Sequence, residues 1–153
     1  NGCQLMAELG LVSPDAPQKA PKMKHNDSHK FESCFVTLRI PENTPAIMLQ
    51  PLKGTQLGIW VAHGEGKFSF PADKGTPTAV NYLYDKYPGN PNGSPEGIAG
   101  VCSPDGRHLA MMPHPERCLR PWNWPYYPQE RRFDESTPWL DMFIAAYNWI
   151  AKI

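Results

Sequence analysis

The sequence lacks three features, each of which would indicate a class of function. It has no excess of charge of one sign, since 15 Lys and Arg residues balance 15 Asp and Glu residues. We therefore expect neither a nucleic-acid partner nor an anionic membrane partner. Its apolar runs are a handful of residues long, far below the roughly 20 residues of a transmembrane helix. The first 15 residues have no basic start followed by an apolar stretch, so the sequence predicts no export signal.

Cysteine is also scarce. The chain has four cysteines and no C-x-x-C pair, which is too few for the disulfide framework of a small secreted domain. Free thiols in a reducing compartment fit this usage best, so we expect a cytoplasmic protein. The four are Cys3, Cys34, Cys102 and Cys118.

What the chain does have is enough length for one domain and many loops. Its 153 residues can bury a sizeable core, and its 18 prolines are more than twice the average usage of about 5%. Good helix formers predict a short helix over 3–9. Alternating or continuous apolar residues predict the strands, and Pro104-Asp105-Gly106 predicts a hairpin between the last two. The expected strands are 31–40, 57–62, 80–84, 98–102 and 108–112.

The chain ends in a second predicted helix, with a proline- and aromatic-rich irregular stretch before it. Thr137 is the expected N-cap and Pro138 occupies the first turn. Apolar residues recur at three- and four-residue spacing, which predicts that one helix face packs on a sheet. These residues are Trp139, Phe143, Ala146, Tyr147 and Ile150. The mixture of elements indicates an α/β or α+β fold.

The strongest candidate for chemistry is His114-Pro115-Glu116, at the end of a predicted strand. In an extended stretch, side chains two residues apart point the same way, and Pro115 restricts the backbone between them. Glu116 is therefore placed to orient and charge-stabilise His114 as a general base. The pair by itself also fits a purely structural role.

A second candidate is Cys3, where Gly2 precedes the first predicted helix. A thiol at a helix N-terminus, after a sharp turn, has the arrangement of a nucleophile elbow. A free cysteine packed as a small hydrophobic residue fits the same position equally well. From the residues themselves, both interpretations of Cys3 remain open.

Five stretches occur in an order and spacing that resemble one family. The combination resembles the glutaminase domain of the phosphoribosylformylglycinamidine synthases, which are class I glutamine amidotransferases. The resemblance runs from Asn1 to about Arg117, and the aromatic segment 122–128 with the last helix resembles the carboxyl end of their single-chain form. The stretches are Asn-Gly-Cys-Gln (1–4), His-Asn-x-Ser-x-Lys-Phe-Glu (25–32), Ala-His-Gly-Glu-Gly (62–66), Asn-Pro-Asn-Gly-Ser-Pro-x-Gly-Ile-Ala-Gly (90–100) and Asp-Gly-Arg-x-x-x-Met-Met-Pro-His-Pro-Glu-Arg (105–117).

The resemblance changes the interpretation of Cys3. The family carries its nucleophile in Gly-x-Cys-x-Gly-x-Gln, and Gly2 and Gln4 match the last Gly and the Gln of that motif. The nucleophilic cysteine would then stand immediately before Asn1, and Cys3 would occupy a variable position. The resemblance thus implies that residues 1–153 are the carboxyl-terminal portion of a flavodoxin-like α/β glutaminase domain, without its amino-terminal part.

Site residues follow from the resemblance position by position. His114 and Glu116 match the family's base and orienting acid, and Gln4 matches the residue that hydrogen-bonds the bound glutamine. Asn1 matches the residue whose backbone N–H contributes to the oxyanion hole. Gly64 and Glu65 match the segment whose backbone meets the amino-acid end of glutamine. The side chains of His63 and Glu65 could equally serve only to order their loop, and the loop 90–95 is expected to be a turn framework.

The implied function is hydrolysis of glutamine through a thioester, with the ammonia passing to a synthetase domain of the same polypeptide. That domain makes formylglycinamidine ribonucleotide from formylglycinamide ribonucleotide, using ATP and Mg²⁺, and the chain itself is expected to hold no cofactor or metal. Without the nucleophile, these residues alone should be inactive. Two alternatives remain: a non-catalytic docking or structural remnant, and a stand-alone amidotransferase subunit.

Overall fold

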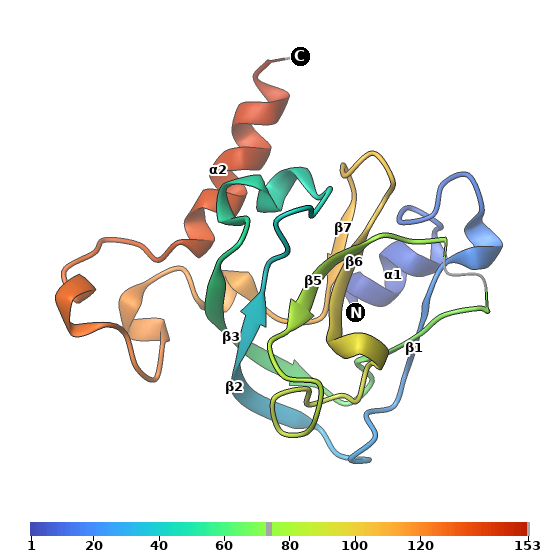
Figure 1. Ribbon diagram of the computed structural model, residues 1–153, viewed down its shortest axis with the longest axis horizontal. Coiled ribbons are helices and arrows are strands. Elements are labelled where there is room, and N and C mark those ends of the chain that lie inside the picture. Colours follow the sequence, from blue (N-terminus) through green and yellow to red (C-terminus); the bar gives the residue numbers. More distant parts are fainter. Residues whose placement is uncertain (73–74, 153) are drawn as a thin grey trace.

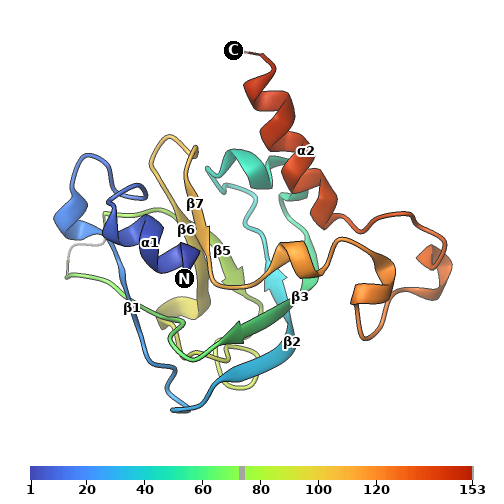
Figure 2. The same cartoon turned by 180° about the vertical axis from the view of Figure 1, so that it is seen from behind.

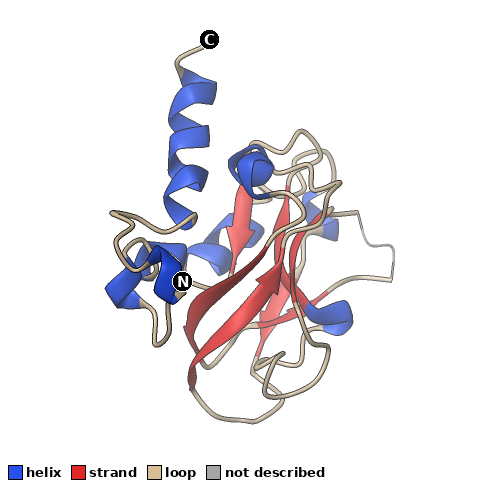
Figure 3. Ribbon diagram, turned by 60° about the vertical axis from the view of Figure 1, so that its left-hand side comes forward, coloured by secondary structure: helices blue, strands red, loops and turns tan. Residues whose placement is uncertain are grey.

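A five-stranded antiparallel sheet is the centre of the fold. The computed structural model describes residues 1–72 and 75–152. The strand order is β3-β2-β5-β6-β7, and the sheet is strongly twisted (Figure 3). A second, two-stranded sheet pairs β1 with β4. The strands are β1 (Lys22–Lys24), β2 (Glu32–Arg39), β3 (Gln56–His63), β4 (Lys67–Ser69), β5 (Thr78–Tyr82), β6 (Ile98–Cys102) and β7 (Leu109–Met111).

Two α-helices lie at the two ends of the chain, as the sequence predicts. Helix α1 covers one face of the sheet beside β7, whereas α2 lies near β3 at the other end (Figures 1 and 2). Short 3-10 helices occupy many of the proline-rich connections. The helices are α1 (Gly2–Glu8), η1 (Pro17–Lys19), η2 (Ile47–Leu52), η3 (Pro95–Gly97), η4 (Pro115–Arg117), η5 (Pro121–Asn123), η6 (Gln129–Arg131) and α2 (Trp139–Ile150).

The five strands of the main sheet form where the sequence predicts them, to within about two residues at each end, whereas β1 and β4 of the second sheet were not predicted. Strands β2 and β3 pair over eight residues, from Glu32 opposite His63 to Arg39 opposite Gln56. Strands β6 and β7 form the predicted hairpin, and Gly106 in its turn has a φ of 73°. A Cβ at Gly106 would lie 2.0 Å from the carbonyl oxygen of Pro45, so only glycine fits there. The hairpin thereby fixes the direction in which the chain leaves β7.

The two faces of the sheet bury two separate apolar clusters. The larger one gathers β2, β3, β5 and η2 around side chains such as Leu38, Ile59 and Trp139. The smaller one joins α1 to β6 and β7 through Cys3, Ala7 and neighbouring apolar residues. Burying one aliphatic side chain contributes about 1.5–3 kcal/mol, so the smaller cluster stabilises α1 on the sheet and the larger one stabilises the first turn of α2.

The prediction that one face of the last helix packs on a sheet is wrong beyond the first turn of that helix. Trp139 is fully buried, and its Nε1–H donates to the carbonyl oxygen of Gly58 in β3 at 2.8 Å. Tyr147 is 72% exposed and Ile150 65% exposed, because the carboxyl-terminal half of α2 extends beyond the body of the protein (Figure 1). The main contacts of α2 are with η2, and near its end the Arg107 guanidinium lies over the Trp149 ring at 5.2 Å from the ring centroid.

Two local predictions also need correction. Thr137 does not cap α2: the N-cap is Pro138, and the Thr137 hydroxyl donates to the carbonyl oxygen of Cys118. The stretch 13–29 has three prolines and no apolar periodicity, which predicts a surface loop. It contains η1 and strand β1, which pairs with strand β4 about 45 residues later. Within the described residues, no helix is both long and apolar enough to cross a membrane.

Candidate active site

One pocket of about 840 Å³ lies where four parts of the fold meet. Its lining comes from the start of α1, the loop after β3, the chain that leaves β7, and Met142 and Phe143 of α2. All six site residues predicted from the resemblance line this pocket. They are Asn1, Gln4, Gly64, Glu65, His114 and Glu116. Residues more than 100 positions apart in the sequence are thus brought to one place, although their roles stay predictions.

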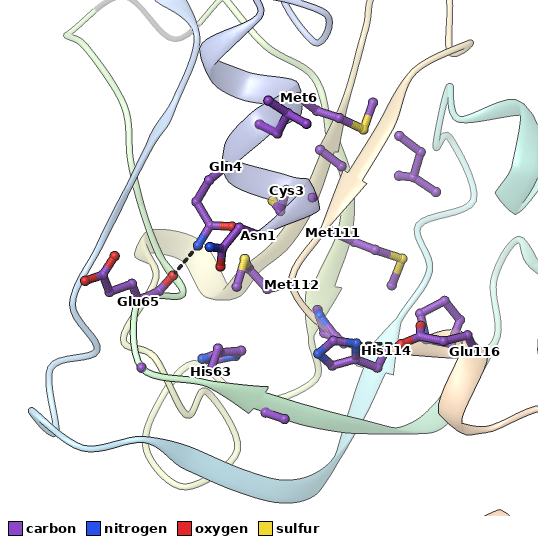
Figure 4. Close-up of a pocket in the computed structure, with 18 of the residues that line it drawn as sticks. Asn1, Cys3, Gln4, Met6, His63, Glu65, Met111, Met112, His114 and Glu116 are labelled. Carbon is purple, nitrogen blue, oxygen red and sulfur yellow. Dashed lines mark hydrogen bonds and ion pairs between the residues drawn. The ribbon is translucent and has the colours of Figure 1, made fainter.

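His114 and Glu116 form one wall of the pocket. The Nδ1 of His114 lies 2.7 Å from Oε1 of Glu116 (Figure 4). A carboxylate oxygen only accepts, so Nδ1 carries the hydrogen and Nε2 of the neutral ring is free to take a proton. The side chains are 27% and 54% exposed, which leaves the pair open to a ligand in the pocket.

The backbone of this wall differs from the expected extended stretch. His114 is the N-cap of η4, a 3-10 turn that begins at Pro115. The turn, rather than strand alternation, brings Glu116 back beside the imidazole ring. The N–H of His114 donates to the carbonyl oxygen of Trp60 at 2.9 Å, which ties this wall to strand β3.

Gln4 and Glu65 meet on another side of the pocket. The Gln4 Nε2 donates to the main-chain oxygen of Glu65 at 3.1 Å, so the start of α1 is joined to the loop after β3 (Figure 4). The Glu65 carboxylate points elsewhere and lies 3.5 Å from His25. Only the main chain of Glu65 therefore takes part in the contact with Gln4.

His63, for which the sequence left the role open, is buried at the base of the same loop. Its side chain is 6% exposed, and burial is the main cause that lowers its pKa to about 4. A positive charge on the nearby His114 lowers the pKa of His63 further. Its Nδ1 lies 3.2 Å from the side-chain oxygen of Asn26, and its Nε2 has no hydrogen-bond partner among the described residues. His63 is therefore a neutral imidazole near neutral pH.

Cys3 lies in α1, is 8% exposed, and belongs to the smaller apolar cluster while also lining the pocket. Burial raises the pKa of this thiol to about 12. The nucleophile in a thiol-dependent reaction is the thiolate, so such a group is poorly suited to attack a substrate. This environment favours the interpretation of Cys3 as a packed hydrophobic residue.

Sequence reasoning missed two kinds of residue in the site. Met112, Met142 and Phe143 line the pocket, but apolar side chains of this kind look like ordinary core residues in a sequence. Asn26 was overlooked as a functional residue although it lies in the quoted stretch 25–32, where the signal was available.

The loop 90–95 is held by its own buried side chains, Asn90, Asn92 and Ser94. Groups of three or more acidic, His or Cys side chains suited to a metal ion do not occur in 1–72 or 75–152.

Comparison with known proteins gives the same interpretation over nearly the whole chain. A family model described as the CobB/CobQ-like glutamine amidotransferase domain matches residues 1–150. A probable phosphoribosylformylglycinamidine synthase, chloroplastic/mitochondrial, from Arabidopsis thaliana is 45% identical over 98% of this chain. The phosphoribosylformylglycinamidine synthases of Drosophila melanogaster and Homo sapiens are 43% and 40% identical over 99% and 97% of it. The chain spans only 12–13% of the length of these relatives.

The fold has a counterpart among solved structures. A chain in the structure of PurLQS from Thermotoga maritima superposes with a TM-score of 0.70 and 26% identity, over 97% of this chain and 58% of that chain. The predicted α/β amidotransferase fold is thereby confirmed. The chain belongs to the CobB/CobQ-like glutamine amidotransferase family, and within it corresponds to part of the phosphoribosylformylglycinamidine synthases.

Proposed function

We propose that this chain is the carboxyl-terminal portion of a glutaminase domain in an amidotransferase of purine biosynthesis. The observation that carries the proposal is one pocket in which the His114–Glu116 pair and the Gln4–Glu65 contact both lie. The first offers a proton acceptor with its orienting acid, and the second offers main-chain and amide groups for a polar substrate. The identity to phosphoribosylformylglycinamidine synthases over nearly the whole chain supports it.

In the proposed reaction, His114 acts as the general base. It takes the proton of a cysteine thiol, and the thiolate attacks the side-chain amide carbon of glutamine to form a tetrahedral intermediate. The backbone N–H of Asn1 helps stabilise the negative oxygen. The protonated His114 then gives its proton to the amino group of the intermediate, the C–N bond breaks to release ammonia, and a thioester remains. Water, activated by the same imidazole, releases glutamate and restores the thiol.

Glutamine itself is proposed to bind against Gln4 and the main chain of Gly64 and Glu65. The Gln4 amide already donates to Glu65 O, which holds this part of the pocket in place before a ligand arrives. Glu116 keeps the His114 ring oriented and stabilises its cationic form, since the acceptor is a carboxylate 2.7 Å away.

The partners and cofactors follow from the same proposal. Ammonia would pass to a synthetase domain of the same polypeptide, which would convert formylglycinamide ribonucleotide to formylglycinamidine ribonucleotide with ATP and Mg²⁺. Both cofactors would belong to that domain and not to this chain. We further propose that the enzyme is cytoplasmic and contacts neither nucleic acid nor membranes.

The nucleophile is proposed to be the cysteine that the family motif places before Asn1, and not Cys3. The test uses the full-length protein and its Cys3→Ser variant. We expect the unaltered protein to release glutamate from glutamine, and the variant to keep that rate within about threefold, because a buried thiol contributes only packing. The 153-residue chain expressed by itself should release none.

The outcomes separate the two parts of the proposal. No glutamate release by the full-length protein would contradict the glutaminase function. Glutamate release that Cys3→Ser abolishes would instead keep the function and make Cys3 the nucleophile.

A further inference from the structure

Asn26 lies at the centre of a hydrogen-bond network that holds the pocket loop 63–66. The residue is fully buried, although it sits in an otherwise exposed, polar stretch. Its side-chain Nδ2 donates to the carbonyl oxygens of His63, at 2.7 Å, and Lys30, at 2.9 Å. Its Oδ1 accepts from the N–H of Gly66 at 3.1 Å, and its own backbone N–H donates to the carbonyl oxygen of Gly64 at 2.9 Å.

These partners determine how the Asn26 amide is oriented. Two carbonyl oxygens can only accept, so the nitrogen must face them, and a backbone N–H can only donate, so the oxygen must face Gly66. Asn26 thus contacts the main chain of three of the four loop residues. A buried amide with all of these partners satisfied stabilises this loop conformation, because breaking the contacts would leave buried polar groups unpaired.

The same geometry sets the tautomer of His63. The Asn26 Oδ1 beside its Nδ1 is an acceptor, so Nδ1 carries the hydrogen and Nε2 does not. The ring also lies directly against Gly66, where a Cβ would be 2.5 Å from Nδ1. Ring, glycine and amide therefore form one close-packed unit beneath the loop.

Within this unit His63 lines the pocket, whereas Asn26 and Gly66 lie outside the lining. Gly64 and Glu65 line the pocket, and the carbonyl oxygen of Glu65 receives the Gln4 amide. The side chain of Asn26 lies outside that lining. Any effect of Asn26 on a ligand must therefore pass through the loop.

We propose that Asn26 is a positioning residue for glutamine binding: it holds the main chain of residues 63–66, and the Nδ1–H tautomer of His63, in the arrangement that receives the substrate. The inference rests on the proposed glutaminase function. A loop fixed before binding spares the ligand the cost of ordering it, so Asn26 raises the affinity for glutamine without touching the substrate.

The test compares Asn26→Ser with Asn90→Ser in the full-length protein. Asn90 is an equally buried amide that also makes four hydrogen bonds, but all of them join residues of the segment 85–94. We expect Asn26→Ser to raise KM for glutamine roughly tenfold, with kcat less affected, while synthesis from ammonium salts stays unchanged. Asn90→Ser should leave KM for glutamine near its original value.

Three results would overturn the inference. They are an unchanged KM in a folded Asn26→Ser protein, equal losses of glutamine- and ammonium-dependent synthesis, and an equal rise in KM in Asn90→Ser. An unaltered protein that releases no glutamate would instead contradict the proposed function, and the inference with it.

A spectroscopic measurement covers the case in which Asn26→Ser does not fold. NMR of the ring nitrogens in the unaltered protein should show His63 as the neutral Nδ1–H form at neutral pH. A protonated ring, or the Nε2–H form, would show that Asn26 does not hold His63 as described, and would overturn the inference.

Discussion

The two walls of the pocket each carry a histidine, and the two rings differ both in burial and in the group that faces Nδ1. His63 is buried and its Nδ1 faces the neutral amide of Asn26. His114 is 27% exposed and its Nδ1 faces the carboxylate of Glu116. A carboxylate stabilises an imidazolium and an amide does not, so proton transfer suits His114 and fixed geometry suits His63.

Removing the ring on the exposed wall should have the largest effect. In the full-length protein, we expect His114→Ala to lower glutamine-dependent synthesis by about 10²–10⁴-fold, the usual contribution of a general base. Synthesis from ammonium salts should persist, because the base serves only glutamine hydrolysis. Steady-state assays with each nitrogen donor measure the two rates.

The matched variant on this wall is Glu116→Gln. It keeps the ring and a hydrogen-bond acceptor but loses the charge, so the loss of glutamine-dependent synthesis should be smaller than in His114→Ala. If His114→Ala abolished the ammonium-dependent reaction as well, His114 would be a structural residue and the contrast between the walls would fail.

The second-largest effect is expected when the pH is lowered, because His63 in the buried wall then makes folding less favourable. His63 has a pKa of about 4 when folded and about 6.5 when unfolded, so between these values only the unfolded chain gains the proton. The contribution of His63 to stability is complete above about pH 6.5 and decreases as the pH falls toward 4. A shift of this size corresponds to a loss on the order of 3 kcal/mol in the free energy of unfolding.

The measurement is the free energy of unfolding at several pH values between these limits, for the protein and for His63→Gln. Other groups titrate in this range, so the difference between the two proteins isolates His63. Parallel pH profiles would show that His63 is already protonated in the folded state or has an ordinary pKa there.

The smallest effect is expected at Arg117, next to the exposed wall. Its Nε lies 3.7 Å from Glu116 Oε1, and both side chains are more than half exposed. Such pairs are screened by water and salt and contribute about 0–1 kcal/mol. Arg117→Ala should therefore change the rate of glutamine hydrolysis by less than about threefold at moderate salt. A tenfold loss would show that Arg117 helps to hold Glu116 on His114.

Sequence predicted the fold best where the determinants are local. The Pro104-Asp105-Gly106 turn specifies its hairpin, and β-branched and aromatic residues specify β2. The last helix was predicted well in extent but not in packing. Periodic apolar residues such as Tyr147 show that the helix has an apolar face. Only the tertiary structure shows that the carboxyl-terminal part of this face has no other element of the protein to pack on.

The residues of the site also divide into those whose contacts are local in the sequence and those whose contacts are not. His114 and Glu116 are two residues apart, so their pairing could be predicted from the residues themselves, although the 3-10 turn that forms it could not. Gln4 and Glu65 are 61 residues apart, and only the family resemblance linked them. The Asn26 unit joins residues about 40 positions apart through main-chain atoms, which leave no pattern in a sequence.

Strand β3 joins the two walls, and this has a consequence for the shape of the pocket. The strand ends at His63, and its Trp60 carbonyl oxygen accepts the hydrogen bond from the N–H of His114. Three residues of an extended strand span about 10 Å and hardly stretch. The strand therefore acts as a spacer that keeps the two histidines at a constant separation. The pocket has a fixed width along β3, and its dimensions can change only across the strand, where the short helix α1 and the first turns of α2 form the remaining sides.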